Sequence, residues 1–343
     1  MKKIIVTGVT GQDGSHMVDY LLKHTDHEIY GSVRRLSVKN HENILHLENV
    51  PRFHLIDMDL NDAHSMRDVI LDVQPDYFIN FAAQSFVAGS WNYPIQTWDT
   101  DANAVLHILE SIRRFAPQCR FYNAGSSEEF GDVIYSPQNE EHPLRPQSPY
   151  GAAKCGARHI VRVYKESYKM YAVQGWLFNH EGNRRGLDFV TRKITHTIAR
   201  IKIAIEKGKE APVLRLGNIE AQRDWSDAED FMEGVWLMLN QKAPKNYVLG
   251  SGEMHTVREF LNEALNSAGI QFKTSGSRDD EKYHTLDGKL IFEVDPKFYR
   301  PAEVHELCGD ASLAEKEMGW VRKTNFHELV DKMYKSDYNL LNR

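Results

Sequence analysis

The residues with the clearest chemical potential lie between Phe121 and Lys154. Tyr150 and Lys154 are four positions apart, so a helix places both side chains on one face. An ammonium beside a phenol favours the phenolate, and we therefore expect Lys154 to lower the pKa of Tyr150. A phenol tuned toward neutrality can take a proton from an alcohol while a hydride leaves the same carbon. This pair predicts alcohol oxidation.

A hydroxyl and a carboxylate precede that pair. Ser126 and Glu128 follow a predicted strand at Arg120–Ala124. Ligands of parallel sheets bind outside the carboxyl ends of the strands. We therefore expect Ser126 and Glu128 to lie in the same site as Tyr150 and Lys154.

A glycine turn near the start of the chain offers a place for a nucleotide cofactor. It follows a predicted strand at Lys3–Thr7 and precedes a helical apolar pattern from Ser15 to Lys23. Glycines there let the backbone approach a pyrophosphate at a helix N-terminus. A plain tight turn is the alternative, and the strand–turn–helix context favours the cofactor. The cofactor-binding residues expected in this turn are Gly8, Gly11, Gln12, Asp13 and Gly14.

Three later strand ends add to the expected cofactor site. The strand at Glu28–Val33 ends in Arg34 and Arg35, whose guanidinium groups suit the 2′-phosphate of NADP better than the ribose of NAD. A solvated basic pair is the alternative reading. We also expect Asp59 and Leu60 beside the adenine. After the strand at 77–81, Ala82 and Ala83 either let the cofactor lie against the backbone or serve close helix packing.

The order of the predicted elements indicates the fold class. Strand and helix patterns alternate five times, which predicts an α/β, Rossmann-type, doubly wound parallel sheet with a smaller α+β substrate-binding domain. We expect the nucleotide-binding domain to comprise residues 1–177 and 213–245, and the substrate-binding domain residues 178–212 and 246–343. Helices are expected at 150–169, 189–207 and 224–239.

Composition excludes several function classes. The 343 residues are 41% hydrophobic and 26% charged with a net charge of −6, which is ordinary for a globular protein and argues against nucleic acid or membranes as partners. No apolar run approaches the ~20 residues that span a bilayer. The three cysteines have no metal-ligand spacing, and no metal site is expected. A strand begins within the first few residues, so we expect no signal peptide and a cytoplasmic protein.

Basic residues of the second half fall near the ends of predicted elements. Arginine can hold a diphosphate bidentately, although each residue taken singly is as easily a solvated surface side chain. The set comprises Arg184, Arg185, Arg192, Lys193, Arg223 and Arg300.

With these motifs the sequence resembles the extended short-chain dehydrogenase/reductases and, within them, the GDP-mannose 4,6-dehydratases along almost its whole length. The resemblance implies an NADP-dependent lyase that makes a GDP-4-keto-6-deoxy sugar and assembles as a homo-oligomer, either dimer or tetramer. The segments that carry it are 7–15, 33–35, 82–85, 148–150, 178–181, 184–186, 189–194, 217–218, 223–225, 295–296 and 300–304.

The resemblance also implies a role for each matching residue. Tyr150, helped by Lys154, would take the proton of the sugar 4-hydroxyl, and Glu128 would remove the proton of carbon 5 before water leaves from carbon 6. Arg34 and Arg35 would bind the 2′-phosphate, or part of this pair would contact the cofactor loop of a neighbouring subunit. The catalytic set would be Ser126, Glu128, Tyr150 and Lys154, and Tyr150, Lys154, His180 and Arg185 would also contact the cofactor. The substrate would be held by Ser85, Asn179, Val190, Lys193, Arg223, Arg300 and Glu303.

Departures from the family pattern leave the sugar open. Residues 125–131 replace the pattern Ser-Thr-Ser-Glu-Leu-Tyr-Gly, so Ser126 keeps the hydroxyl of threonine and Glu129 adds a carboxylate that we expect to be solvated. Residues 86–89 and 179–183 also differ. All these positions lie around the expected hexose, and GDP-manno-heptose therefore stays an alternative to GDP-mannose.

Two other activities also stay open. A sugar-nucleotide epimerase or reductase needs Tyr150 and Lys154 but no carboxylate at position 128. A non-catalytic NADP-binding scaffold on this fold is also possible, because fold alone does not determine function. Such proteins often lack the tyrosine and lysine that this chain has. The mass of the product separates these alternatives.

Overall fold

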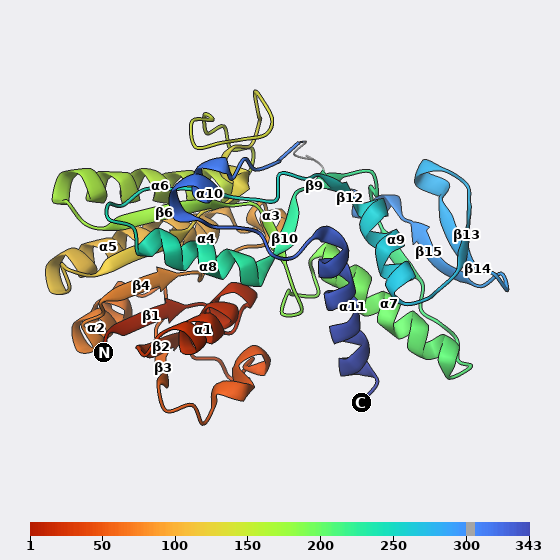
Figure 1. Ribbon diagram of the computed structural model, residues 1–343, viewed down its shortest axis with the longest axis horizontal. Coiled ribbons are helices and arrows are strands. Elements are labelled where there is room, and N and C mark those ends of the chain that lie inside the picture. The colour runs from red at the N-terminus through yellow and green to blue at the C-terminus, as the bar shows by residue number, and fades with distance from the viewer. Residues whose placement is uncertain (300–305) are drawn as a thin grey trace. The chain divides into compact units, whose positions relative to one another are not determined.

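The computed structural model describes residues 1–299 and 306–343. The chain forms two compact units, each made of three stretches of sequence, and many of their elements are labelled in Figure 1. The first unit comprises Met1–Phe178, Ala228–Gly252 and Leu307–Val321. The second comprises Asn179–Asp227, Glu253–Glu306 and Arg322–Arg343.

A seven-stranded parallel sheet forms the centre of the first unit, in the order β11-β6-β5-β4-β1-β2-β3. The chain order reverses between β1 and β4, where open α/β sheets bind their ligands. The strands are β1 (Lys3–Thr7), β2 (Glu28–Val33), β3 (Phe53–Asp57), β4 (Tyr77–Asn80), β5 (Arg120–Ala124), β6 (Ala172–Leu177) and β11 (Val248–Leu249). The helices are α1 (Gln12–His24), α2 (Ala63–Val73), α3 (Val87–Ser90), α4 (Pro94–Trp98), α5 (Ala104–Phe115), α6 (Pro149–Tyr168), α8 (Ala228–Leu239) and α10 (Ser312–Met318). Shorter turns are η1 (Glu42–Leu47), the π-helical η2 (Asp99–Asn103) and η3 (Ser127–Glu129).

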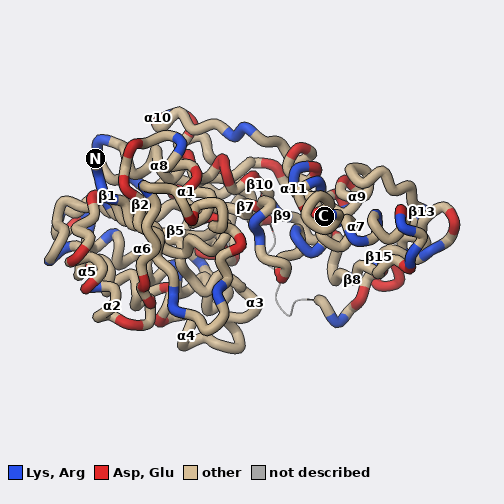
Figure 2. Tube along the Cα trace, turned by 90° about the horizontal axis from the view of Figure 1, so that it is seen from below, with Lys and Arg blue, Asp and Glu red and all other residues tan. Residues whose placement is uncertain are grey.

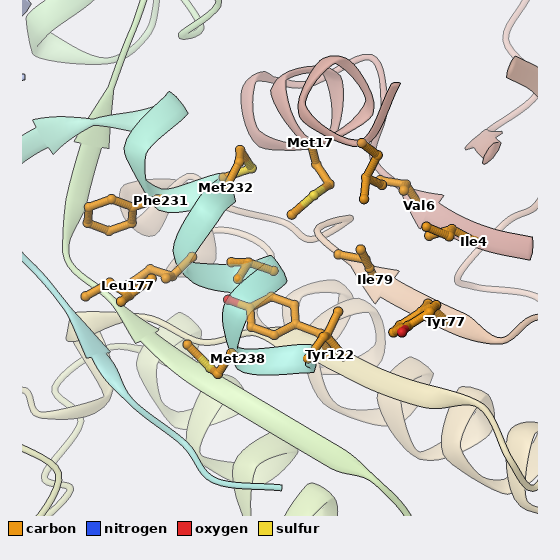
Figure 3. Close-up of a cluster of buried hydrophobic side chains, with 14 of the residues drawn as sticks. Ile4, Val6, Met17, Tyr77, Ile79, Tyr122, Leu177, Phe231, Met232 and Met238 are labelled. Atoms are coloured by element: carbon orange, nitrogen blue, oxygen red, sulfur yellow. The ribbon is translucent and has the colours of Figure 1, made fainter. Parts of the chain in front are cut away.

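Both faces of this sheet are buried, which is why its strands read as nearly continuous apolar runs. On one face, Val6 and Tyr122 pack with Met17 of α1 and Met232 of α8 (Figure 3). On the other face, residues such as Phe78 pack against α2, α5 and α6. The predicted doubly wound fold is confirmed.

The second unit is built around a four-stranded sheet in the order β13-β14-β15-β8. Helices α7, α9 and α11 contribute the apolar side chains of its core. Its strands are β7 (Asn179–Glu181), β8 (Leu214–Leu216), β9 (Gln222–Arg223), β10 (Trp225–Asp227), β12 (His255–Thr256), β13 (Phe272–Ser275), β14 (Lys282–Thr285) and β15 (Leu290–Val294). Its helices are α7 (Val190–Glu206), α9 (Val257–Ser267) and α11 (Phe326–Leu341), with short turns η4 (Arg278–Asp280) and η5 (Pro296–Phe298).

The unit boundaries differ from the expected domain boundaries. Residues 213–227 lie in the second unit, because β8 pairs with β15 and β10 pairs with β7. Residues 246–252 and 307–321 lie in the first unit, because β11 pairs with β6 and Trp320 Nε1 donates to Asp230 O at 2.8 Å. The helix expected from residue 224 begins only at Ala228, since the preceding residues are β10.

A buried ion pair fixes part of the second unit. Arg192 on α7 contacts the Asp337 carboxylate of α11 at 2.6 Å, and Thr195 Oγ1 donates to the same carboxylate at 2.7 Å. The guanidinium also donates to the backbone oxygens of Asn183 and Arg185. Arg192 therefore holds the loop before α7, and its charge is already compensated inside the unit. The sequence places Arg192 among the candidate diphosphate ligands, whereas in the structure its guanidinium pairs with Asp337.

Charges are spread over both units. Figure 2 shows Lys and Arg interspersed with Asp and Glu along the tube of each unit. Within residues 1–299 and 306–343, no helix has the length and apolarity needed to cross a membrane.

Candidate active site

The turn after β1 has a backbone that only glycine accommodates. Gly8 has a φ of +70°, and a Cβ added there would lie 2.9 Å from Ala82 N. A Cβ at Gly14 would lie 2.3 Å from Gly8 O. Helix α1 then starts after Gly11 without a side-chain cap, so its first N–H groups face the turn. Glycine at these positions lets the turn approach the end of β4 and the start of α1 closely, and this cradle of backbone at a helix N-terminus fits the pyrophosphate of a dinucleotide.

The glycine turn is tied to the end of β4. Thr7 Oγ1 accepts from the backbone N–H groups of Phe81 at 3.1 Å and Ala82 at 2.9 Å. The half-buried Ala82 and Ala83 therefore pass directly beside Gly8 at the point where the strand order reverses. Ser85, expected at the hexose, is exposed just beyond them.

The other predicted cofactor residues follow β2 and β3. Arg34 and Arg35 come directly after β2 and are both exposed. Asp59 Oδ1 accepts from Asn61 N at 2.9 Å, so this carboxylate shapes the turn after β3, where Leu60 is buried. These positions are all at the carboxyl ends of neighbouring strands.

The four predicted catalytic residues lie in η3 with its cap and on α6. Ser126 caps η3, and its Oγ accepts from Glu128 N at 3.2 Å. The Ser126 hydroxyl also shares a hydrogen bond with the Tyr150 phenol in the first turn of α6. Lys154 Nζ donates to Ala124 O at 2.9 Å. The fold therefore brings the serine and tyrosine into contact, with Glu128 in the same turn and Lys154 anchored at the end of β5.

The prediction of a lowered pKa for Tyr150 is wrong in this structure. Burial raises the pKa of the phenol, the nearby Asp101 carboxyl raises it further, and the hydrogen bond with Ser126 acts in the opposite direction. Lys154 Nζ lies 5.6 Å from the centroid of the Tyr150 ring and is engaged with a backbone oxygen instead. Desolvation therefore outweighs the neighbouring ammonium.

Asp101 is a buried carboxyl that the sequence analysis did not select. It lies in the π-helical η2 and is 2% exposed. Its Oδ1 accepts from Gln84 N at 2.7 Å, and its Oδ2 has no hydrogen-bond partner among the residues that the structure describes. Burial raises the pKa of Asp101 to about 6, against the opposing effects of Lys154 and the Gln84 amide. The sequence signal that could have identified Asp101 is an aspartate inside an otherwise helical stretch.

A row of buried polar side chains crosses the sheet next to the site. Thr7, Asn80, Asn123 and Gln174 are register partners on β1, β4, β5 and β6. Thr7 donates to Asn80 at 2.6 Å, Asn80 to Asn123 at 2.7 Å, and Asn123 to Gln174 at 2.7 Å. The sequence signal that we missed is a polar residue inside each of four apolar strands. We call these four residues the polar row.

The polar row ends on Glu129, whose expected exposure is wrong. The Glu129 side chain is fully buried and pairs with Arg158 of α6. Gln174 Nε2 donates to Glu129 Oε1 at 3.1 Å. Glu128, one residue earlier, is only half-buried. The two adjacent carboxylates therefore have opposite environments, and Glu129 faces the sheet.

The remaining predicted residues belong to the second unit. Arg185 pairs with Glu181 at 3.1 Å and stacks on Phe189 at 3.6 Å. Lys193 Nζ donates to Arg215 O at 2.7 Å, and burial lowers the pKa of this lysine. Asn179 and His180 are in β7, Val190 begins α7 and Arg223 ends β9. Arg300 and Glu303 lie outside the described residues.

Comparison with known proteins identifies the family. A family model described as GDP-mannose 4,6 dehydratase matches residues 5–333. The GDP-mannose 4,6 dehydratase of Drosophila melanogaster is 40% identical over 351 residues, covering 100% of this chain and 87% of that protein. The chain belongs to the GDP-mannose 4,6 dehydratase family. The resemblance found in the sequence is confirmed.

Solved structures share the fold of this GDP-mannose 4,6 dehydratase family member at lower identity. A dTDP-glucose 4,6-dehydratase of Bacillus anthracis in complex with NAD is 19% identical with a TM-score of 0.78, covering 98% of this chain and 96% of that one. RMD of Pseudomonas aeruginosa, complexed with NADPH, is 20% identical with a TM-score of 0.78, covering 99% and 100%. Both dinucleotides thus occur among proteins of this fold, and the fold does not choose between them.

The burial of Asp101 generates a prediction for stability against pH. The pKa of the Asp101 carboxyl is raised to about 6 in the folded protein. The stability that protonated Asp101 contributes is therefore lost as the pH rises from the ordinary pKa of an aspartate through about 6. Asp101→Asn keeps the acceptor for Gln84 N and cannot ionise. We expect its Tm to match that of the wild type near pH 4 and to exceed it by roughly 2–6 °C at pH 7.5.

Differential scanning calorimetry from pH 4 to pH 8 measures this difference. Asp99→Asn is the matched control, because this residue is exposed in the same turn and its substitution removes the same charge. A constant difference between Asp101→Asn and the wild type across the range would contradict the assignment.

Proposed function

We propose that this protein is an NADP-dependent hydro-lyase that converts GDP-mannose to GDP-4-keto-6-deoxy-mannose. The observation that carries the proposal is membership of the GDP-mannose 4,6 dehydratase family over residues 5–333, in a chain that keeps a hydrogen-bonded Ser126–Tyr150 pair with Glu128 in the same turn. The activity follows the names of relatives that match the whole chain.

Each residue of the catalytic set has a role that its chemistry supports. Tyr150 accepts the proton of the sugar 4-hydroxyl, and Ser126 donates a hydrogen bond to the same oxygen. We propose that Lys154, held at Ala124 O, supplies a positive charge that counters the burial which raises the pKa of Tyr150. Glu128 takes the proton from carbon 5, which the ketone at carbon 4 acidifies, and passes it to the departing carbon-6 hydroxyl, which leaves as water. Carbon 5 is reprotonated when hydride returns to carbon 6, and the proton that Tyr150 accepted balances this step.

The cofactor is proposed to be NADP, which when bound takes up hydride from carbon 4 and gives it back at carbon 6. The cradle of Gly8 and Gly14 at the start of α1 would hold its pyrophosphate. Arg34 and Arg35 would bind its 2′-phosphate, since two exposed guanidinium groups follow β2 where binders of NAD place an acid. In the second unit, Lys193 and Arg223 are proposed to bind the diphosphate of the GDP-sugar.

The proposed reaction predicts the loss of one water from the sugar nucleotide. Protein incubated with GDP-mannose and NADP should give a product lighter by one water, as measured by mass spectrometry. Glu128→Gln should slow this loss by about 100-fold or more, because the base is removed while the hydrogen bond at Glu128 N remains. Glu141→Gln is the matched control, because this glutamate is exposed in the following loop, whereas Glu129 is buried.

Other outcomes would assign another reaction. A product of unchanged mass would indicate an epimerase, and net consumption of NADPH would indicate a reductase. A parallel incubation with GDP-manno-heptose tests the alternative sugar. If only GDP-manno-heptose loses water, it is the substrate and GDP-mannose is not. Elimination by Glu128→Gln at the wild-type rate would exclude Glu128 as the base.

The basic residues after β2 predict the choice of cofactor. Isothermal titration should show NADP binding at least about 10-fold more tightly than NAD, because charge-assisted hydrogen bonds to the 2′-phosphate are lost with NAD. Arg34→Ser/Arg35→Ser should weaken NADP binding about 10- to 100-fold and leave NAD within about 3-fold. Lys39→Ser, at an exposed position nearby, controls for net charge. Equal binding of NAD and NADP by the wild type would contradict the proposal.

We also propose that the protein is a homo-oligomer, a dimer or tetramer. The segment containing α3 and α4 exposes several large apolar side chains, which in a monomer would face water. They are Phe86, Trp91, Tyr93, Ile95 and Trp98, exposed by 43%, 59%, 62%, 78% and 44%. Light scattering after size exclusion should give a multiple of 39.6 kDa, and Ile95→Glu should lower it. A monomeric wild type at about 10 μM, a working concentration at which specific complexes persist, would contradict this proposal.

A further inference from the structure

The buried pair of Glu129 and Arg158 lies directly behind the candidate catalytic segment. The Glu129 carboxylate is fully buried and Arg158 is 5% exposed. Arg158 Nε and Nη2 both donate to the carboxylate, and the guanidinium stacks on the Trp176 ring at 3.5 Å from its centroid. Arg158 also donates to Gln174 O at 2.8 Å and Gly175 O at 3.3 Å. Arg158 is therefore anchored on the backbone of β6.

Glu129 in turn holds the backbone of Ser126. Its Oε1 accepts from Ser126 N at 2.9 Å, in a reciprocal arrangement in which Glu129 N donates to Ser126 O at 3.1 Å. Ser126 is the residue whose hydroxyl contacts Tyr150 and accepts from Glu128 N. A displacement of Ser126 would therefore move both the serine hydroxyl and the start of the turn that presents Glu128.

The same carboxylate is linked to the helix that carries Tyr150 and Lys154. Gln174 Nε2 donates both to Glu129 Oε1 at 3.1 Å and to Lys154 O at 3.0 Å. One buried amide thus joins η3 to α6. Through the polar row this amide is also connected to Thr7, which holds the end of β4 beside the glycine turn.

Gly125 shows that the segment is shaped around this pair. A Cβ at Gly125 would lie 2.7 Å from Glu129 Oε1, 2.7 Å from Arg158 Nη2 and 2.1 Å from Gly175 O. No side chain fits between β5 and the ion pair. The departures from the family pattern at positions 125 and 129 are therefore two parts of one packing arrangement, in which the Glu129 side chain is buried.

We propose that Glu129, fixed by Arg158, is a positioning residue that sets Ser126 and Glu128 relative to Tyr150 and Lys154. This inference deepens and rests on the proposed dehydratase function. A buried ion pair gains little net stability, because desolvation of both charges offsets their attraction. The hydrogen bond that Glu129 accepts from Ser126 N instead fixes the position of Ser126. A misplacement of about 1 Å near reacting groups can cost about 100-fold in rate.

The main test replaces both charges with apolar side chains of similar size. Glu129→Leu/Arg158→Met removes the acceptor for Ser126 N without leaving a buried charge unpaired, so its Tm should stay within roughly 5 °C of the wild type. Its kcat for water loss from GDP-mannose should fall about 10- to 100-fold, while KM changes by less than about 3-fold. Such a split points to placement of the reacting groups, because the substrate-binding residues are untouched.

A conservative variant separates the hydrogen bond from the charge. Glu129→Gln keeps an oxygen for Ser126 N but leaves Arg158 unpaired, so it should lower Tm while retaining kcat within about 5-fold at a temperature where it is folded. Asp132→Asn/Arg145→Gln is the matched control, because this ion pair follows η3 but is half exposed, and its loss should leave kcat unchanged.

A second measurement needs neither cofactor nor substrate. Hydrogen exchange followed by mass spectrometry should show faster exchange in peptides covering residues 121–131 for Glu129→Leu/Arg158→Met, and wild-type exchange there for the control. A wild type that removes no water from either GDP-sugar would end the proposed function, and the exchange measurement would still decide whether Glu129 holds this segment.

Three results would overturn the inference. They are a kcat within about 3-fold of the wild type for the apolar double variant, unchanged exchange in residues 121–131 of that variant, or an equal fall in kcat for Glu129→Gln. The last result would assign the effect to the lost charge and not to the hydrogen bond at Ser126.

Discussion

Polar groups buried in a sheet must find hydrogen-bond partners, and in this protein that requirement organises the carboxyl edge of the sheet in the first unit. The polar row satisfies it by pairing side chains at equivalent positions of four parallel strands. A one-residue slip of any of these strands would turn its polar side chain to the opposite face and leave the neighbours unpaired. The row therefore fixes strand register near the carboxyl ends, where apolar packing alone tolerates substitutions more readily.

The direction of the hydrogen bonds along the row has a structural consequence. Each amide accepts on one side and donates on the other, so the row needs an acceptor at its end. Glu129 supplies it, and a carboxylate without protons can also accept from Ser126 N. At the opposite end, Thr7 Oγ1 donates to Asn80 and accepts from the backbone after β4. The glycine turn and the candidate catalytic segment are thus held by one continuous hydrogen-bonded set.

Local pattern was sufficient for the parts of the fold that depend on neighbours in sequence. The apolar runs gave the strands of the sheet, and the spacing of Tyr150 and Lys154 placed both on α6. The residues after β10 show the limit: Trp225–Asp227 carry a helix-like pattern but pair with β7, more than forty residues earlier in the chain. A second non-local pairing, of β8 with β15, explains why the unit boundaries differ from the expected domain boundaries.

The elements that carry the candidate site residues were predictable from the sequence, but the electrostatics of these residues were not. Sequence spacing reveals a lysine near a tyrosine, yet it does not reveal that burial raises the pKa of Tyr150 or that Lys154 Nζ points to Ala124 O. Adjacent glutamates are equivalent in a sequence. They differ here because Glu129 is buried against Arg158, which lies on another element, whereas Glu128 is half-buried. Such distinctions depend on three-dimensional partners, which periodicity does not encode.

The Glu129–Arg158 pair links positions that a sequence comparison treats separately. A leucine at position 129 would leave Arg158 as an uncompensated buried cation, which costs far more than the exchange of one apolar contact. A side chain at position 125 would meet Gly175 O as well as the ion pair, so it requires the end of β5 to shift. Because Ser126 lies between these two positions, the hydroxyl in the site depends on both. Changes at positions 125, 129 and 158 are therefore expected to be coupled, and the effect of each on the reaction depends on which side chains occupy the other two.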